Sequence, residues 1–229
     1  MITIQQNNMK KPTEYIKEAI SIYFKKENFI FFARIMAVIS IASLVIGFIS
    51  GYFYPIEGKN YIDFSNILGT FGFITVSVVA FVLGLWGQTT TYVSILKMGK
   101  KEKEIFTLGY KNMWKFFLSS LVVGLIILGG IILLIIPAVI FGIWYSFTLI
   151  LVLDKNLSIK EALSKSKEMV KGKFMKIFGR FIVFGLFGMV VSIILSVIPF
   201  NIGSLAVSFA SPLFILPTVL LYRDLVTGN

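Results

Sequence analysis

The 229-residue chain contains no cysteine and no histidine, and only 11 of its residues are acidic. The absence of cysteine excludes a disulfide framework and thiolate chemistry. The absence of histidine removes the commonest general base and the commonest transition-metal ligand. No acidic residue lies inside any long apolar stretch, so a proton relay or a carboxylate site for a coupled cation within a membrane is not expected. The sequence therefore predicts a protein that is not an enzyme and holds neither metal nor cofactor.

Apolar residues are abundant: they make up 57% of the chain, include 23 phenylalanines and give a mean hydropathy of +0.88. A soluble core cannot absorb that much apolar surface. The first 27 residues are polar, and the first apolar run is too long for a secretory signal, so we expect it to stay as a span. Because a span needs about 20 apolar residues, we predict an all-α membrane protein. Its expected parts are a cytoplasmic amphipathic segment at 1–27 and a transmembrane domain at 28–225, with spans at about 29–54, 67–96, 116–136, 138–153, 177–198 and 202–222.

The third and fourth spans lie in one uncharged stretch, and so do the fifth and sixth. Gly129, Gly130 and Pro137 can bend the first stretch, which predicts a tight turn near Ile135 to Ala138. A second turn is predicted from Pro199 to Gly203.

The charges are distributed unevenly between the two sides of this predicted topology. Lys59, Glu57 and Asp63 lie between the first and second spans, which leaves 21 of the 22 basic and 9 of the 11 acidic residues on the other side. The balance is +12 against −1, so the positive-inside rule predicts a multi-pass protein of the cytoplasmic membrane with both termini in the cytoplasm. The basic residues are dispersed around helix ends without interleaved aromatics, which argues against nucleic-acid binding.

A short motif recurs before the spans. Ile16 to Ser21 (IKEAIS) precedes the first span, and Ile159 to Ser164 (IKEALS) precedes the fifth. A weaker copy, Lys103 to Thr107, precedes the third. Repetition in fixed order is typical of duplicated supersecondary units. We therefore predict three hairpins of two spans, each preceded by a cytoplasmic amphipathic helix.

The segment before the fifth span has the clearest helical pattern. Ser158 and Glu161 fit a capping box, in which each side chain bonds a free backbone N–H of the first turn. One face is apolar and the other is rich in lysine. Such a helix either lies in the membrane interface, attracted to anionic headgroups, or packs on the cytoplasmic ends of the spans; the two interpretations are compatible. The apolar face carries Ile159, Ala162, Leu163, Met169 and Val170, and the polar face carries Lys160, Lys165, Lys167, Glu168 and Lys171.

The second half of the chain resembles a known membrane-domain superfamily. An apolar span from Pro137 to Leu153 ends in Asp154, and a surface helix with an A-L-x-x-S-x(5)-G pattern follows (Ala162, Leu163, Ser166, Gly172). Together with the closing Leu221 to Leu225, this is similar to the membrane domain of some glycerophosphodiester phosphodiesterases and to stand-alone six-span bacterial and archaeal proteins of that superfamily. The resemblance implies a fold. It implies no activity, because the fused enzymes perform catalysis with histidine and carboxylates in a separate soluble domain, and this chain has no histidine.

Four basic residues form a candidate site for lipid phosphate. Arg34 and Arg180 occupy matching places, a few residues inside the first and fifth spans, and Lys115 and Lys176 lie at similar depth. Basic pockets between helices bind anionic headgroups near the inner leaflet. The alternatives are snorkelling of these side chains to the interface, or pairing with the aspartates that end neighbouring spans.

A second candidate site is a polar path through the membrane. Gln88, Thr89 and Thr90 form the most polar stretch inside a span, and Asn201 lies in a predicted turn. These side chains could line water, or they could hydrogen-bond between packed helices.

The function that the sequence favours is a non-enzymatic integral membrane protein that acts as a lipid-binding or partner-binding accessory or scaffold. The expected partners are membrane lipids, with anionic lipids as candidates, and a membrane protein or a second copy of the chain. The alternative is a transporter, or a component for export or resistance, with a polar path through the bundle.

Overall fold

A computed structural model describes residues 9–53, 67–198 and 202–227. Within these ranges the chain is entirely helical, and six of its helical stretches are long and apolar enough to cross a membrane. The predictions of an all-α membrane fold and of six candidate spans are confirmed. The helices are α1 (Pro12–Phe24), α2 (Lys26–Phe53), α3 (Ile67–Leu96), α4 (Glu102–Leu133), α5 (Ile135–Trp144), α6 (Thr148–Asp154), α7 (Ile159–Val170), α8 (Phe174–Ser196) and α9 (Ile202–Thr227).

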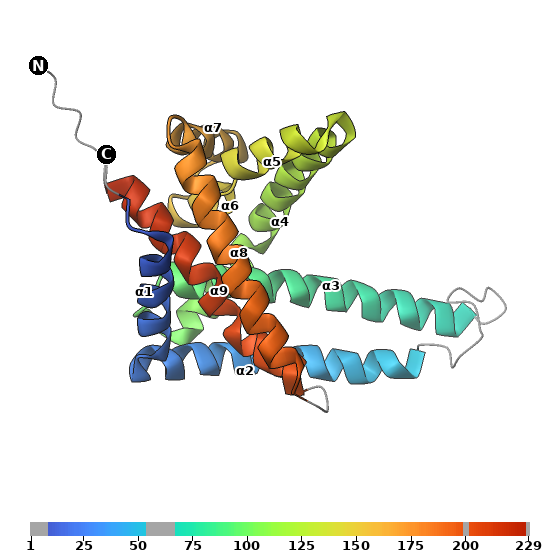
Figure 1. The fold of residues 1–229 in the computed structure, drawn as a ribbon. Coiled ribbons are helices and arrows are strands. Elements are labelled where there is room, and N and C mark those ends of the chain that lie inside the picture. The colour runs from blue at the N-terminus through green and yellow to red at the C-terminus, as the bar shows by residue number, and fades with distance from the viewer. Residues whose placement is uncertain (1–8, 54–66, 199–201, 228–229) are drawn as a thin grey trace, which may run out of the picture.

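Consecutive helices lie side by side in three pairs, α2 with α3, α4 with α5, and α8 with α9, and α3 also packs on α4. The pairs meet at one end, where α1, α6 and α7 also lie, and their other ends diverge in different directions (Figure 1). Most fully buried side chains belong to the shared end, among them Phe32, Ile95, Phe147 and Leu221. Apolar residues near the diverging ends are exposed instead, as Ile135 and Val197 are.

The turn between α4 and α5 is narrow. α4 ends at Leu133 and α5 begins at Ile135, so only Leu134 joins them. A Cβ atom at Gly130 would lie 2.8 Å from the backbone of Ala138, so the two helices could not approach this closely with a larger residue. Pro137 lies in the first turn of α5, where its missing N–H leaves no helical hydrogen bond unmade. The second predicted turn falls largely on residues 199–201, outside the described part of the chain.

The stretch predicted as the fourth span is not one continuous helix. α5 ends at Trp144 and α6 starts at Thr148, which frees backbone groups at the interruption. Ser166 of α7 satisfies two of them, because its hydroxyl donates to the Trp144 carbonyl at 2.7 Å and accepts from the Phe147 N–H at 3.1 Å. The interruption therefore depends on a side chain from another helix, which the local sequence does not reveal.

The three segments that carry the recurring motif differ in their continuity. α1 ends before α2, and α7 ends at Val170, two residues before Gly172, whose φ of +77° favours glycine. The middle copy is continuous with its span within the 32-residue α4. No glycine or proline separates the two parts between Lys111 and Ser120, so nothing in the sequence ends the helix there.

Each of these segments packs on another helix. α1 packs on α9, the first turns of α4 pack on α3, and α7 packs on α6. The side chains buried in these contacts occupy corresponding positions when the copies are aligned on their Lys-Glu dipeptides. They are Ala19 and Tyr23 in α1, Ile105 and Gly109 in α4, and Ala162 and Ser166 in α7.

Candidate functional site

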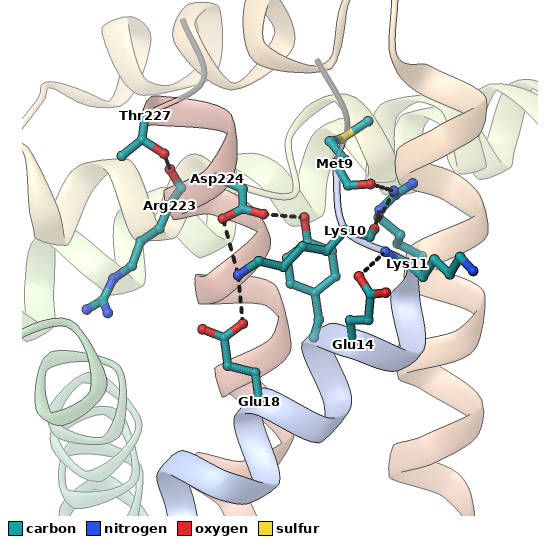
Figure 2. A network of polar contacts seen from close by, with 10 residues as sticks. Met9, Lys10, Lys11, Glu14, Glu18, Arg223, Asp224 and Thr227 are labelled. Carbon is teal, nitrogen blue, oxygen red and sulfur yellow. Dashed lines mark hydrogen bonds and ion pairs between the residues drawn. The ribbon is translucent and has the colours of Figure 1, made fainter. Parts of the chain in front are cut away.

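A connected group of polar side chains lies where the N-terminal segment meets α8 and α9 (Figure 2). The Tyr15 hydroxyl donates to the Asp224 carboxylate at 2.8 Å. The Lys10 ammonium lies 2.8 Å from Glu18 and 3.9 Å from Asp224, so it joins both carboxylates. We call Lys10, Tyr15, Glu18, Asp224 and Arg180 the N-terminal clamp.

A second group at the shared end of the helix pairs has the same chemistry. The Tyr222 hydroxyl donates to Asp154 at 2.9 Å, and the Lys97 ammonium donates to the other oxygen of that carboxylate at 3.1 Å. Lys155 lies 3.7 Å from Asp154. These contacts join α3, α6 and α9, so one carboxylate connects three helices at the end where the pairs meet.

The surroundings of the clamp raise the pKa values of two of its side chains. Burial raises the pKa of the Tyr15 phenol well above its usual range, and the hydrogen bond to Asp224 adds to the effect. The hydrogen bond to Glu18 raises the pKa of Lys10 despite an opposing effect of burial. Both groups therefore keep their protons at neutral pH, as the hydrogen bonds to the carboxylates require.

Arg180 belongs to the clamp through backbone carbonyls. Its guanidinium donates to the carbonyl of Lys10 at 2.6 and 3.2 Å and to that of Met9 at 3.0 Å. A further bond reaches the Lys176 carbonyl one turn earlier on α8. In this arrangement the guanidinium holds the segment that precedes α1 against α8.

The other predicted lipid-phosphate residues engage different segments. Arg34 donates to Glu102 at 3.2 Å, at the start of α4, and its side chain is exposed. Lys115 donates to the side chain of Asn156 at 2.7 Å and to its backbone carbonyl at 3.1 Å. Lys176 is exposed. The structure does not bring the four residues together around one common point.

The residues of the predicted polar path also have separate environments. Thr89 and Thr90 are fully buried, whereas the neighbouring Gln88 is exposed. The Thr89 hydroxyl donates to the Leu85 carbonyl within its own helix, and Thr90 lies against Gly109 of α4. Asn201 lies outside the described residues.

A surface cavity of about 360 Å³ lies beside α7. Its lining comes from the end of α5 and the second half of α7: Trp144, Ser164, Lys167, Glu168 and Lys171. The Lys167 ammonium lies 4.3 Å from the centre of the Trp144 ring, a cation–π contact. Within the described ranges, no three histidine, cysteine or acidic side chains gather as metal ligands.

Sequence reasoning considered Asp154 and Asp224 as alternative partners for the four basic residues of the predicted lipid-phosphate site. In the structure their closest partners are tyrosines and lysines instead: Tyr222 and Lys97 for Asp154, Tyr15 and Lys10 for Asp224. The usable signal was the position of each aspartate at the end of an apolar run. Comparison with known proteins finds no matching family model, no matching curated protein and no matching solved structure.

Proposed function

We propose that this chain is a non-enzymatic multi-pass protein of the cytoplasmic membrane that works by binding lipids or a membrane-protein partner. One observation carries the proposal: the helix pairs diverge and leave large apolar side chains uncovered between and around them. Ile132, Ile135 and Val197 are 77 to 79% exposed. In a bilayer these surfaces need acyl chains or another apolar protein surface to cover them.

The same proposal includes three hairpins, each preceded by an amphipathic helix at the cytoplasmic interface, with both termini inside. The charge balance of +12 against −1 supports this orientation. The alternation of buried and charged positions in α7 supports an interfacial place for that helix. Membership of the glycerophosphodiester phosphodiesterase membrane-domain superfamily remains part of the proposal and rests on the quoted motifs alone.

The polar stretch of α3 lends little support to a transport path. Thr89 and Thr90 are enclosed by neighbouring helices, whereas the adjacent residue Gln88 is exposed. Small polar side chains in such positions stabilise helix contacts in membranes. An accessory or scaffold function therefore agrees better with the geometry.

The absence of natural cysteines makes single-cysteine labelling a direct test of the topology. With an impermeant thiol reagent, cysteine at Asn60 should react in intact cells, and cysteine at Asn156 should react only after permeabilisation. Labelling of Asn156 from outside would contradict the orientation.

Purification of the protein tests whether it binds lipid or a membrane-protein partner. In mild detergent the protein should retain lipid or a membrane-protein partner through size-exclusion chromatography, as measured by native mass spectrometry. A protein that retains neither, and that accelerates solute flux in proteoliposomes, would support the transporter alternative.

A further inference from the structure

The lining of the cavity beside α7 carries two lysines and one glutamate. Lys165 lies 3.1 Å from Glu168, so the only carboxylate in the lining already has a cationic partner. Lys167 and Lys171 have no ion pair with any described residue. Two ammonium groups, with the hydroxyl of Ser164 beside them, therefore remain available to an anion.

The aromatic wall of the cavity gives the site its depth in the proposed orientation. Trp144 is the last residue of α5, and tryptophan side chains concentrate at the headgroup level of membranes. α5 has 10 residues, which corresponds to about 15 Å of helix. Ile140 and Ile136 lie about one and two turns before Trp144, and Ile136 is exposed, so a molecule that binds beside Trp144 can extend along α5 towards them.

We infer that this cavity binds the phosphate of an anionic phospholipid, with Lys167, Lys171 and Ser164 contacting the headgroup and α5 contacting an acyl chain. The inference rests on the proposed function and specifies its lipid class and its site. It locates the phosphate at α7 and not at Arg180, whose guanidinium is already bonded to backbone carbonyls. Ammonium groups near an anionic headgroup each add affinity for it, and the apolar helix favours a lipid over a free phosphate ion.

The test uses the full chain in nanodiscs of phosphatidylcholine that contain a minor fraction of phosphatidylglycerol. Native mass spectrometry measures which lipid stays bound. The wild type should retain phosphatidylglycerol preferentially. Lys167→Gln combined with Lys171→Gln should lower that retention by about tenfold, because each lysine near an anionic headgroup contributes a few-fold in affinity.

The matched control is Lys17→Gln combined with Lys160→Gln. It removes the same charge from exposed, unpaired positions on α1 and α7 outside the cavity, and should leave retention unchanged. Size-exclusion chromatography and circular dichroism verify the fold of each variant. If a double variant does not fold, Lys171→Glu alone gives the same comparison by charge reversal at one exposed residue.

Competition separates the two sources of phosphate. Millimolar inorganic phosphate or glycerol 3-phosphate should not displace the bound phospholipid, whereas displacement by either would assign the cavity to a soluble ligand and overturn the inference. Equal loss of phosphatidylglycerol in both double variants, or loss in neither, would also overturn the inference about this cavity. Neither result would contradict the proposed function, because lipid could still bind elsewhere on the protein. A wild type that retains no lipid and no partner would reject the proposed function itself.

Discussion

The hydroxyl of Tyr15 donates a 2.8 Å hydrogen bond to the carboxylate of Asp224, which lies 209 residues further along the chain. This bond joins α1 to α9 (Figure 2), at the end where the three helix pairs meet (Figure 1). Lys10 approaches the same carboxylate, and Arg180 holds the backbone beside Lys10. The two ends of the described chain are therefore held together by a small group of polar side chains.

Replacing Tyr15 with phenylalanine removes this bond and keeps the ring. Hydrogen bonds to charged groups contribute about 1.5–3 kcal/mol, and partial exposure of the Asp224 side chain places this one at the lower end. We expect Tyr15→Phe to lower the thermal stability of the detergent-solubilised protein. Tyr110→Phe is the control, because Tyr110 is exposed and its hydroxyl makes no described hydrogen bond. Equal melting temperatures for the two variants would show that the bond contributes nothing to stability.

Arg180 provides a second prediction about the N-terminal clamp. An ammonium group is a single point of charge and cannot reproduce the fork with which the guanidinium bonds the carbonyls of Met9 and Lys10. Arg180→Lys should therefore free this segment and speed tryptic cleavage after Lys10, as followed by mass spectrometry.

Arg34→Lys is the matched control for this experiment, because Arg34 bonds Glu102 and no residue of the N-terminal segment. It should leave the cleavage rate unchanged. If both variants are cleaved at the wild-type rate, the contacts of Arg180 do not restrain the segment.

The helices themselves were predictable because each depends on a local run of apolar residues. The run from Ile67 to Leu96 is one helix, as expected, since it is long and mainly apolar and contains neither a charged residue nor a proline. The capping box of Ser158 and Glu161 is also present, because both of its residues lie within one turn.

The contacts among the polar side chains were not predictable in the same way. Asp154 bonds Tyr222 and Lys97, which lie 68 and 57 residues away, and nothing local indicates either choice. The interruption between α5 and α6 likewise depends on Ser166 from a different helix. Arg34 and Arg180 have matching sequence positions, yet their partners differ because different helices pack beside them.

The N-terminal clamp should weaken at alkaline pH. Tyr15 has a folded-state pKa above its ordinary value of 10.0, so the folded state retains the phenol proton at pH values where the unfolded state loses it. Stability from this group is therefore constant below about pH 10 and falls above it. Lys10, whose pKa is raised above 10.5, acts in the same direction, because its ion pairs are present below that pH and are lost as the pH rises through the folded pKa.

Thermal denaturation between pH 8 and pH 12 measures this effect. The stability difference between the wild type and Tyr15→Phe should shrink as the pH rises above 10, because the variant has lost the group that titrates. A difference that stays constant over this range would show that the Tyr15 proton equilibrium is not linked to folding.

The contact between Gly109 of α4 and Thr90 of α3 leads to the last prediction. A Cβ atom at position 109 would overlap the Thr90 hydroxyl and lie 3.1 Å from the Thr90 Cα, so the two helices would have to separate. Overpacking of this kind typically costs about 1–3 kcal/mol, whereas replacing glycine by alanine in a helix gains up to about 1 kcal/mol. Because the overlap involves backbone as well as a side chain, we expect Gly109→Ala to lower the melting temperature.

Gly124→Ala, on the same helix, supplies the control. No atom lies within 4 Å of a Cβ at that position, so this variant should keep or slightly raise the melting temperature. Adding Thr90→Ala to Gly109→Ala removes the overlapping hydroxyl but not the close Cα, and should recover only part of the loss. If Gly109→Ala is as stable as Gly124→Ala, then α3 and α4 do not depend on the absence of a side chain at residue 109. The close approach of these helices would then have to rest on their other contacts, such as the 3.3 Å bond from the Trp86 indole N–H to the Phe106 carbonyl.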